Sequence, residues 1–266
     1  MLQTLPRSKT KSGAAYLDQG YGSEVLVLIH GVGMQIEAWR PQIERLSRDH
    51  RVIAVDLPGH GFSPPLSGTP DLRDFVAWFA NVVGDLNLSG INVAGHSMGA
   101  LIAAGFAATE ASKNRRVALL NGVHKRTLAA RTAVEARADE IMSGDFDREA
   151  PLERWFSPDE KDGDAYRLVH DLLKKVDARG YAAAYRAFAT GDAVYADDWS
   201  GVTCPALFLT GDGDKNSTAE MAGEMAKATP NGRAIVIEGH RHMVNLTAPE
   251  EVSEILADWL TWQPVR

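Results

Sequence analysis

Cysteine is nearly absent from this chain of 266 residues, in which Cys204 is the single one. One cysteine excludes an internal disulfide, and no cysteines and histidines stand at the spacing of a zinc site. No run approaches the ~18 consecutive apolar residues of a membrane span. Residues 1–11 also lack the apolar core of a signal peptide. We therefore expect a cytoplasmic protein that has no metal centre and does not enter a membrane.

Positive charge is scarce as well. The chain has 28 Lys and Arg against 35 Asp and Glu, a formal net charge of −7. The basic residues are scattered and form no stripe, so nucleic acid is not an expected partner. A small-molecule substrate is the partner that we expect, and the oligomeric state stays open. The length suits one large domain that carries a smaller insert.

Short apolar runs are the main regular feature that is present. Continuous apolar runs are typical of strands buried on both faces of a parallel sheet. They fall at residues 25–29, 52–55, 91–94, 117–120, 206–209 and 234–237. Helical spacing separates most of them, and a weak hairpin is expected within residues 1–20. This alternation predicts an α/β fold with a doubly wound, mostly parallel sheet.

The alternation stops at residues 123–200, which contain no convincing strand and show helical periodicity throughout. We expect a core domain formed by residues 1–122 and 201–266, with residues 123–200 as a helical cap or lid. Such an insert would lie over the carboxyl ends of the strands, where open α/β sheets bind ligands.

A nucleophilic serine is indicated by Gly95-His96-Ser97-Met98-Gly99, which follows an expected strand and opens an expected helix. A G-x-S-x-G pattern in this context places the serine on a strained strand-to-helix turn, with its hydroxyl clear of the sheet. The backbone N–H of Met98 would lie at a helix N-terminus and could face an oxyanion. Ser97 is therefore the predicted nucleophile.

The acid and the base should follow the serine in the chain. The strand ending at Thr210 is followed by two aspartates, of which we favour Asp214 over Asp212. The strand ending near residue 237 is followed by two histidines, and we favour His242 over His240. Histidine titrates near working pH, and a buried aspartate fixes its tautomer.

A second oxyanion donor is expected in the loop after the strand at 25–29. Glycines flank Val32 there, so its backbone N–H can approach a substrate closely. His30, His60 and His96 are more simply interpreted as structural hydrogen-bonding residues.

Taken together, these motifs resemble the α/β-hydrolase superfamily in its serine-nucleophile form, over nearly the whole chain. The matching pieces are His30-Gly31-Val32-Gly33, Asp56-Leu57-Pro58-Gly59-His60-Gly61, Gly95-His96-Ser97-Met98-Gly99, Gly211-x-x-Asp214 and His242. The resemblance implies a Ser97–His242–Asp214 triad, oxyanion donors at Val32 and Met98, and no metal or organic cofactor.

The insert is most similar to that of the 3-oxoadipate enol-lactonase group, through residues 153–158 and 180–187. Hydrolysis of a carboxylic ester or lactone of a small molecule is the expected reaction. Hydrolysis of a C–C bond in a vinylogous diketone, amide hydrolysis, and a ligand receptor without turnover are the alternatives. Arg241 could meet an acidic substrate, although a solvated loop arginine is the simpler interpretation.

The expected pocket residues outside the triad come from the insert. About half of the aromatic ones should instead form the insert's own small core. The pocket candidates are His124, Trp155, Phe156, Tyr181 and Tyr185.

Overall fold

The computed structural model describes residues 4–144 and 147–264. Residues 1–3 of the expected hairpin segment and 145–146 of the expected insert lie outside the described residues. An eight-stranded sheet in the order β1-β2-β4-β3-β5-β6-β7-β8 is formed within them. The strands are β1 (Ser8–Lys9), β2 (Ala15–Gln19), β3 (Val25–Ile29), β4 (Arg51–Val55), β5 (Ile91–His96), β6 (Asn114–Leu120), β7 (Ala206–Gly211) and β8 (Gly232–Ile237).

The sheet is parallel from β4 to β8, while β1 and β2 form an antiparallel hairpin on one edge. The central strands are buried on both faces because successive side chains point to opposite sides of a sheet. Val27 and Ile29 join one apolar core, whereas Leu26 and Leu28 join the other. The predicted doubly wound, mostly parallel α/β sheet is confirmed.

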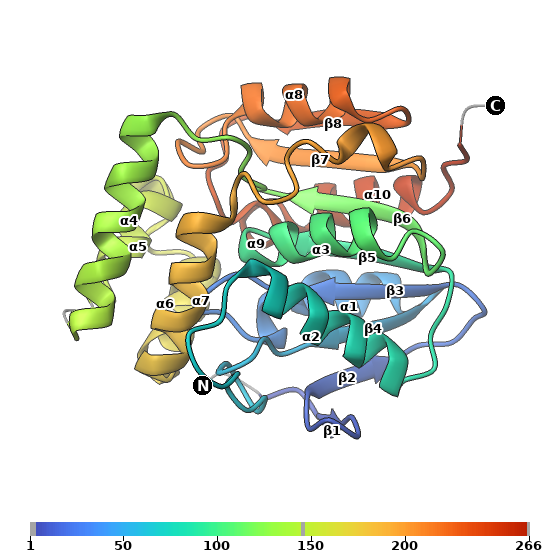
Figure 1. The fold of residues 1–266 in the computed structure, drawn as a ribbon, viewed down its shortest axis with the longest axis horizontal. Coiled ribbons are helices and arrows are strands. Elements are labelled where there is room, and N and C mark those ends of the chain that lie inside the picture. Colours follow the sequence, from blue (N-terminus) through green and yellow to red (C-terminus); the bar gives the residue numbers. More distant parts are fainter. Residues whose placement is uncertain (1–3, 145–146, 265–266) are drawn as a thin grey trace.

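Helices cover both faces of the sheet (Figure 1). One layer contains α2 (Leu72–Asp85), α3 (Met98–Thr109) and α8 (Ala219–Ala228), whose apolar residues belong to the first core. The other layer contains η1 (Ile36–Trp39), α1 (Arg40–Leu46) and α10 (Pro249–Trp259), which pack on the second core. The short α9 (Val244–Thr247) leads into α10. No described helix combines the length and apolar character of a membrane span.

Between β6 and β7 the described chain is helical, and some of these helices contribute residues to the pocket described below. Its elements are α4 (Leu128–Ser143), α5 (Ala150–Trp155), η2 (Pro158–Glu160), α6 (Asp164–Lys175), α7 (Ala178–Gly191) and η3 (Trp199–Gly201). Thr127 caps α4 by accepting a hydrogen bond from the N–H of Ala130, and Gly144 ends it at φ 99°. In Figure 1, α4 to α7 stack at the end of the sheet toward which β3, β5 and β7 point.

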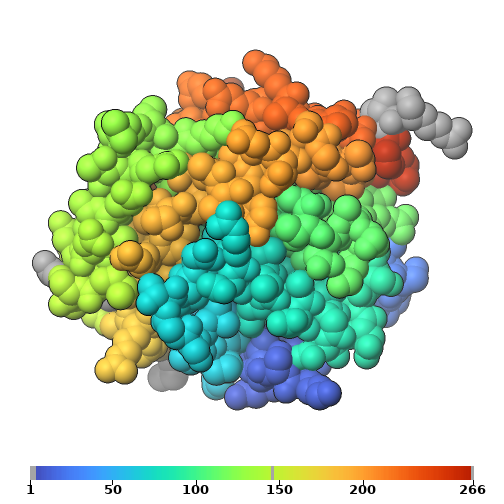
Figure 2. Space-filling model, in the orientation of Figure 1, coloured from blue at the N-terminus to red at the C-terminus, as the bar shows by residue number. Residues whose placement is uncertain are grey.

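The space-filling view shows how closely these helices fit the rest of the chain. The amber atoms around α7 meet the cyan and teal atoms around α2 in one continuous surface on this face (Figure 2). We refer to residues 123–200 as the helical insert.

Candidate active site

Ser97 lies on a sharp turn between β5 and α3, with φ 55° and ψ −112°. A non-glycine residue rarely adopts positive φ, so this backbone is strained and held by its surroundings. The N–H of Ser97 donates to the carbonyl of Leu120 at 2.9 Å. A Cβ at Gly95 would overlap the Gly99 carbonyl, and one at Gly99 would overlap the Ile29 carbonyl. The two glycines of the motif are therefore what lets the turn close.

Asp214 and His242 contact each other through their side chains. Nδ1 of His242 lies 2.7 Å from Oδ2 of Asp214, and the two residues are 2% and 3% exposed. Asn121 donates to the same carboxylate oxygen at 2.9 Å, and the N–H of Asn216 donates to Oδ1 at 2.9 Å. Burial raises the pKa of Asp214, but the charge of His242 and these hydrogen bonds outweigh it and lower the pKa below its ordinary value. The carboxylate stays ionised, ready to stabilise an imidazolium.

The two alternative residues have other contacts. Oδ1 of exposed Asp212 accepts the N–H of Gly239 at 2.9 Å and so shapes the loop after β8. Nδ1 of His240 lies 2.8 Å from Oγ1 of Thr247. Arg241 donates to the carbonyl of Phe156 at 2.7 Å, which ties the histidine loop to the helical insert.

The backbone donors expected at Val32 and Met98 come from two different turns. The next two N–H groups of the first turn are held inside the protein: Gly33 donates to Nε2 of His60 at 3.0 Å, and Met34 donates to the Gly31 carbonyl at 3.2 Å. Val32 lines the pocket that contains Ser97. Met98 is the first residue of α3, where a helix leaves its N–H groups without intrahelical partners.

The remaining buried histidines hold loops in place. Nε2 of His30 accepts the N–H of Leu57 at 3.0 Å, and Nε2 of His96 lies 2.7 Å from the carbonyl of His242. Burial and then the charge of His242 lower the pKa of His96 to about 3. His96 is therefore neutral at physiological pH and fixes the backbone of the histidine loop.

Ser97 and His242 line one pocket beneath the helical insert. Trp155 forms part of its wall, and its ring stacks on the His242 ring with centroids 5.6 Å apart. The N–H of His242 donates to the Trp155 carbonyl at 3.3 Å. The complete set of lining residues is Val32, Ser97, Val134, Arg137, Arg154, Trp155, Tyr185, Phe188, Asn216 and His242.

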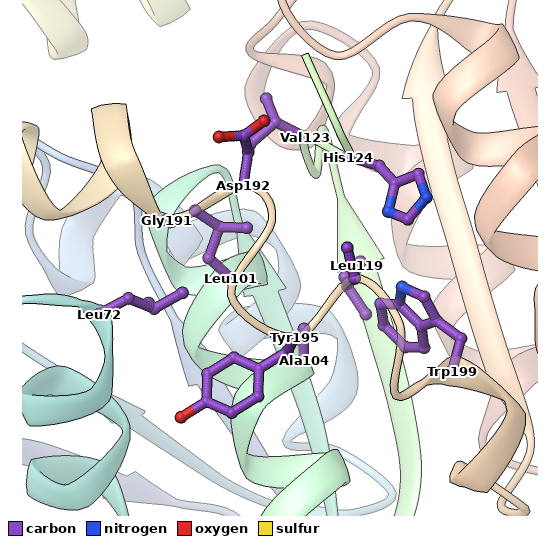
Figure 3. A pocket seen from close by; sticks show the side chains of 11 residues that line it. Leu72, Leu101, Ala104, Leu119, Val123, His124, Gly191, Asp192, Tyr195 and Trp199 are labelled. Carbon is purple, nitrogen blue, oxygen red and sulfur yellow. The ribbon is translucent and has the colours of Figure 1, made fainter. Parts of the chain in front are cut away.

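Three expected pocket residues are not among those lining residues. His124 lines a separate hollow with Asp192 and Trp199 (Figure 3). Phe156 is fully buried against Tyr166, and Tyr181 is stacked on Tyr185. Phe156 and Tyr181 face inward because an insert of this size needs an apolar core of its own.

Sequence reasoning missed other residues of this site. Asn121, at φ 50°, reaches Asp214 from the end of β6, where the sequence shows only that a carboxylate is lacking. Arg137 and Arg154 line the pocket from α4 and α5. Arg137 stands three positions after Val134, which the structure buries, and no signal in the sequence marks it as a pocket residue. Within residues 4–144 and 147–264, no three His, Cys, Asp or Glu side chains gather as a metal site would require.

Comparison with known proteins identifies relatives along the whole chain. The model of the Alpha/beta hydrolase family matches residues 26–255. A (E)-2-((N-methylformamido)methylene)succinate hydrolase of Acinetobacter baylyi is 52% identical over 98% of this chain and 99% of its own length. A 3-oxoadipate enol-lactonase 1 of the same organism is 26% identical over 88% of both chains.

A solved structure extends the likeness to three dimensions. The crystal structure of the enol-lactonase from Burkholderia xenovorans LB400 matches with a TM-score of 0.84 and 24% identity, over 97% of this chain and 100% of that one. At 24% identity this match shows the fold alone. Membership of the family is shown by the sequence, through the family model and the 52% identical relative. The chain belongs to the α/β-hydrolase family and is a hydrolase.

Proposed function

We propose that this hydrolase cleaves the amide bond of an N-formyl enamine that carries two carboxylates. The observation that carries the proposal is the 2.7 Å contact between buried Asp214 and His242 in the loop that shares a pocket with Ser97. The substrate class comes from the name of the 52% identical relative. That name contains no ester or lactone, so it favours the amide and C–C alternatives over the ester or lactone reaction expected from the sequence. Of the two alternatives we propose amide hydrolysis.

The chemistry of the named compound favours attack at the formyl group. Its formamide nitrogen is conjugated with a C=C bond that bears a carboxylate. The nitrogen lone pair is therefore shared with that acceptor, which weakens the amide resonance and stabilises the departing nitrogen. The formyl carbon is also the least hindered carbonyl in the molecule, since it bears only hydrogen. The compound contains no diketone, so a C–C hydrolase would have no stabilised carbanion to release as the leaving group.

In the first half of the proposed reaction, Oγ of Ser97 attacks the formyl carbon while Nε2 of His242 takes the hydroxyl proton. The oxyanion accepts hydrogen bonds from the N–H groups of Val32 and Met98, each worth roughly 10²–10³ in rate by analogy with other hydrolases. Asp214 stabilises the imidazolium. The C–N bond then breaks, the departing nitrogen takes the proton from His242, and a formyl ester remains on Ser97.

In the second half, water replaces the departed enamine in the pocket. His242 takes a proton from this water, and the hydroxide adds to the formyl ester. Collapse of the tetrahedral intermediate returns the proton to Oγ of Ser97 and releases formate.

The test is incubation of the purified protein with (E)-2-((N-methylformamido)methylene)succinate in H₂¹⁸O. We expect one formate, carrying ¹⁸O, for each enamide consumed, and a formyl adduct on the Ser97 peptide after rapid quenching. Release of the enamine without formate, or a higher kcat/KM for simple esters and lactones than for the formamide, would contradict amide hydrolysis. Retention of activity in Ser97→Ala would contradict the assignment of the nucleophile.

A further inference from the structure

Two arginines of the helical insert line the pocket shared by Ser97 and His242: Arg137 from α4 and Arg154 from α5. Both are half-buried. Nε of Arg137 is fully buried and has no hydrogen-bond partner among the described residues. Within residues 4–144 and 147–264, the ion pairs of the insert involve other basic residues, and neither of these guanidinium groups takes part in one. A buried donor without a partner lowers the stability of the folded chain, and more so when the donor is charged.

Other buried arginines in the chain do have carboxylate partners. Arg7 lies 2.6 Å from Glu37, and Arg126, in the same insert, lies 3.3 Å from Asp192. Burial lowers the pKa of Arg154, and the charge of Arg137 lowers it further. The two guanidinium groups are therefore close enough to repel each other, in a chain whose net charge is −7. The charge of Asp147 acts in the opposite direction on the pKa of Arg154 but forms no ion pair with it. Two positive side chains without an ion-pair partner in the described structure of an acidic protein point to an anion that enters the pocket.

We infer that Arg137 and Arg154 bind the two carboxylates of a dicarboxylate substrate and position its third, reacting group against Ser97. This inference rests on the proposed function for the identity of the reacting group, and on the pocket alone for the two charges. A guanidinium presents several N–H donors in a planar fork that matches a carboxylate. Two such forks on different helices distinguish a dianion from a monoanion or a neutral amide. The insert thus selects the substrate, while the core performs the chemistry.

Binding is tested first, without turnover. Isothermal titration of the Ser97→Ala protein uses succinate as the probe and succinamide as its neutral match. Arg137→Gln and Arg154→Gln, each added to this protein, are expected to weaken succinate binding roughly 10- to 100-fold, the range for a lost charged hydrogen bond. Arg167→Gln on α6 is the matched control, because Arg167 is 66% exposed and pairs with Asp164. It should leave the affinity unchanged.

Turnover is tested second, with the serine intact. Both glutamine variants should lower kcat/KM for the dianionic formamide at least tenfold more than kcat/KM for neutral p-nitrophenyl acetate, mainly through KM. If a glutamine variant does not fold, the lysine variant at that position takes its place. Lysine keeps the charge without the fork, so it should bind succinate less tightly than arginine does.

The two proposals fail in different ways. Arginine-dependent succinate binding without hydrolysis of the formamide would refute the proposed function and leave the dicarboxylate site standing. Hydrolysis of the formamide by variants that lose activity equally on charged and neutral substrates would refute the site. Absence of succinate binding to the Ser97→Ala protein, or tight binding of succinamide, would also refute it.

Discussion

Replacement of Asp214 by asparagine tests the proposed triad most directly. Four donors converge on this carboxylate: Nδ1 of His242 at 2.7 Å and Nδ2 of Asn121 at 2.9 Å on Oδ2, and the N–H groups of Asn216 at 2.9 Å and Ser217 at 3.2 Å on Oδ1. An amide has one oxygen to offer them. If its nitrogen faced the backbone, the half-buried N–H of Asn216 and the buried N–H of Ser217 would lose their acceptor, at about 1–3 kcal/mol for the buried group.

The amide nitrogen should therefore face His242. Nδ1 must then lose its hydrogen and accept, which moves the ring hydrogen to Nε2, the atom that has to take the proton from Ser97. Replacement of the triad aspartate by asparagine in a serine protease lowers kcat about 10⁴-fold, which corresponds to about 5 kcal/mol of transition-state stabilisation. We expect a loss of that order for Asp214→Asn, on both the formamide and p-nitrophenyl acetate.

Asp212→Asn is the matched control. Asp212 is exposed and accepts only the N–H of Gly239 in the described structure, and an asparagine oxygen can accept the same bond. Its kcat/KM should stay within about twofold of the wild type, because exposed substitutions of this kind change free energies by about 0.5 kcal/mol or less. Steady-state kinetics of both variants decide the matter. Activity of Asp214→Asn within tenfold of the wild type, or an equal loss in both variants, would refute the reasoning.

Three further outcomes are expected. Ser97→Ala should abolish turnover and change the unfolding free energy by less than about 1 kcal/mol, since alanine keeps the same strained backbone; a cooperative urea transition near that of the wild type checks this. Gly99→Ala should lower the unfolding free energy by about 1–3 kcal/mol, because its Cβ would overlap the Ile29 carbonyl, whereas Gly84→Ala, which meets no atom within 4 Å, should not. The pKa of Asp214 is lowered in the folded protein, so its stabilisation is present above the ordinary value of 3.8 and disappears as the pH falls through the folded pKa. Asp214→Asn should therefore flatten the acid side of the stability curve, and an unchanged acid limb would contradict the role of the carboxylate.

The sheet and the elbow were predictable because their signals are local. Apolar runs such as 25–29 and 117–120 mark strands buried on both faces, and the glycines around Ser97 are required by atoms in adjacent elements. Asp214 and His242 were selected by chain order and by distance from a strand end, and their contact is in keeping with that reasoning. The residues that line the pocket are harder to predict from the sequence. His124 and Tyr181 are aromatic residues of the insert like Trp155, and only the packing of the helices decides which ring faces Ser97.

The arginines of the pocket could not be predicted for a different reason. A charged residue on a helix normally lies on a solvated face, and α4 buries only Val134 and Ala138 among its 16 residues. A binding role for Arg137 becomes apparent only in the structure, where Arg154 of α5 lines the same pocket. Neither arginine forms an ion pair in the described structure, and a bound anion is the partner that we infer for the pair. If this pair binds the substrate's carboxylates, two hydrolases of this family with the same triad can act on different bonds, because the selecting charges lie on insert helices, whereas Ser97, Asp214 and His242 follow strands of the sheet.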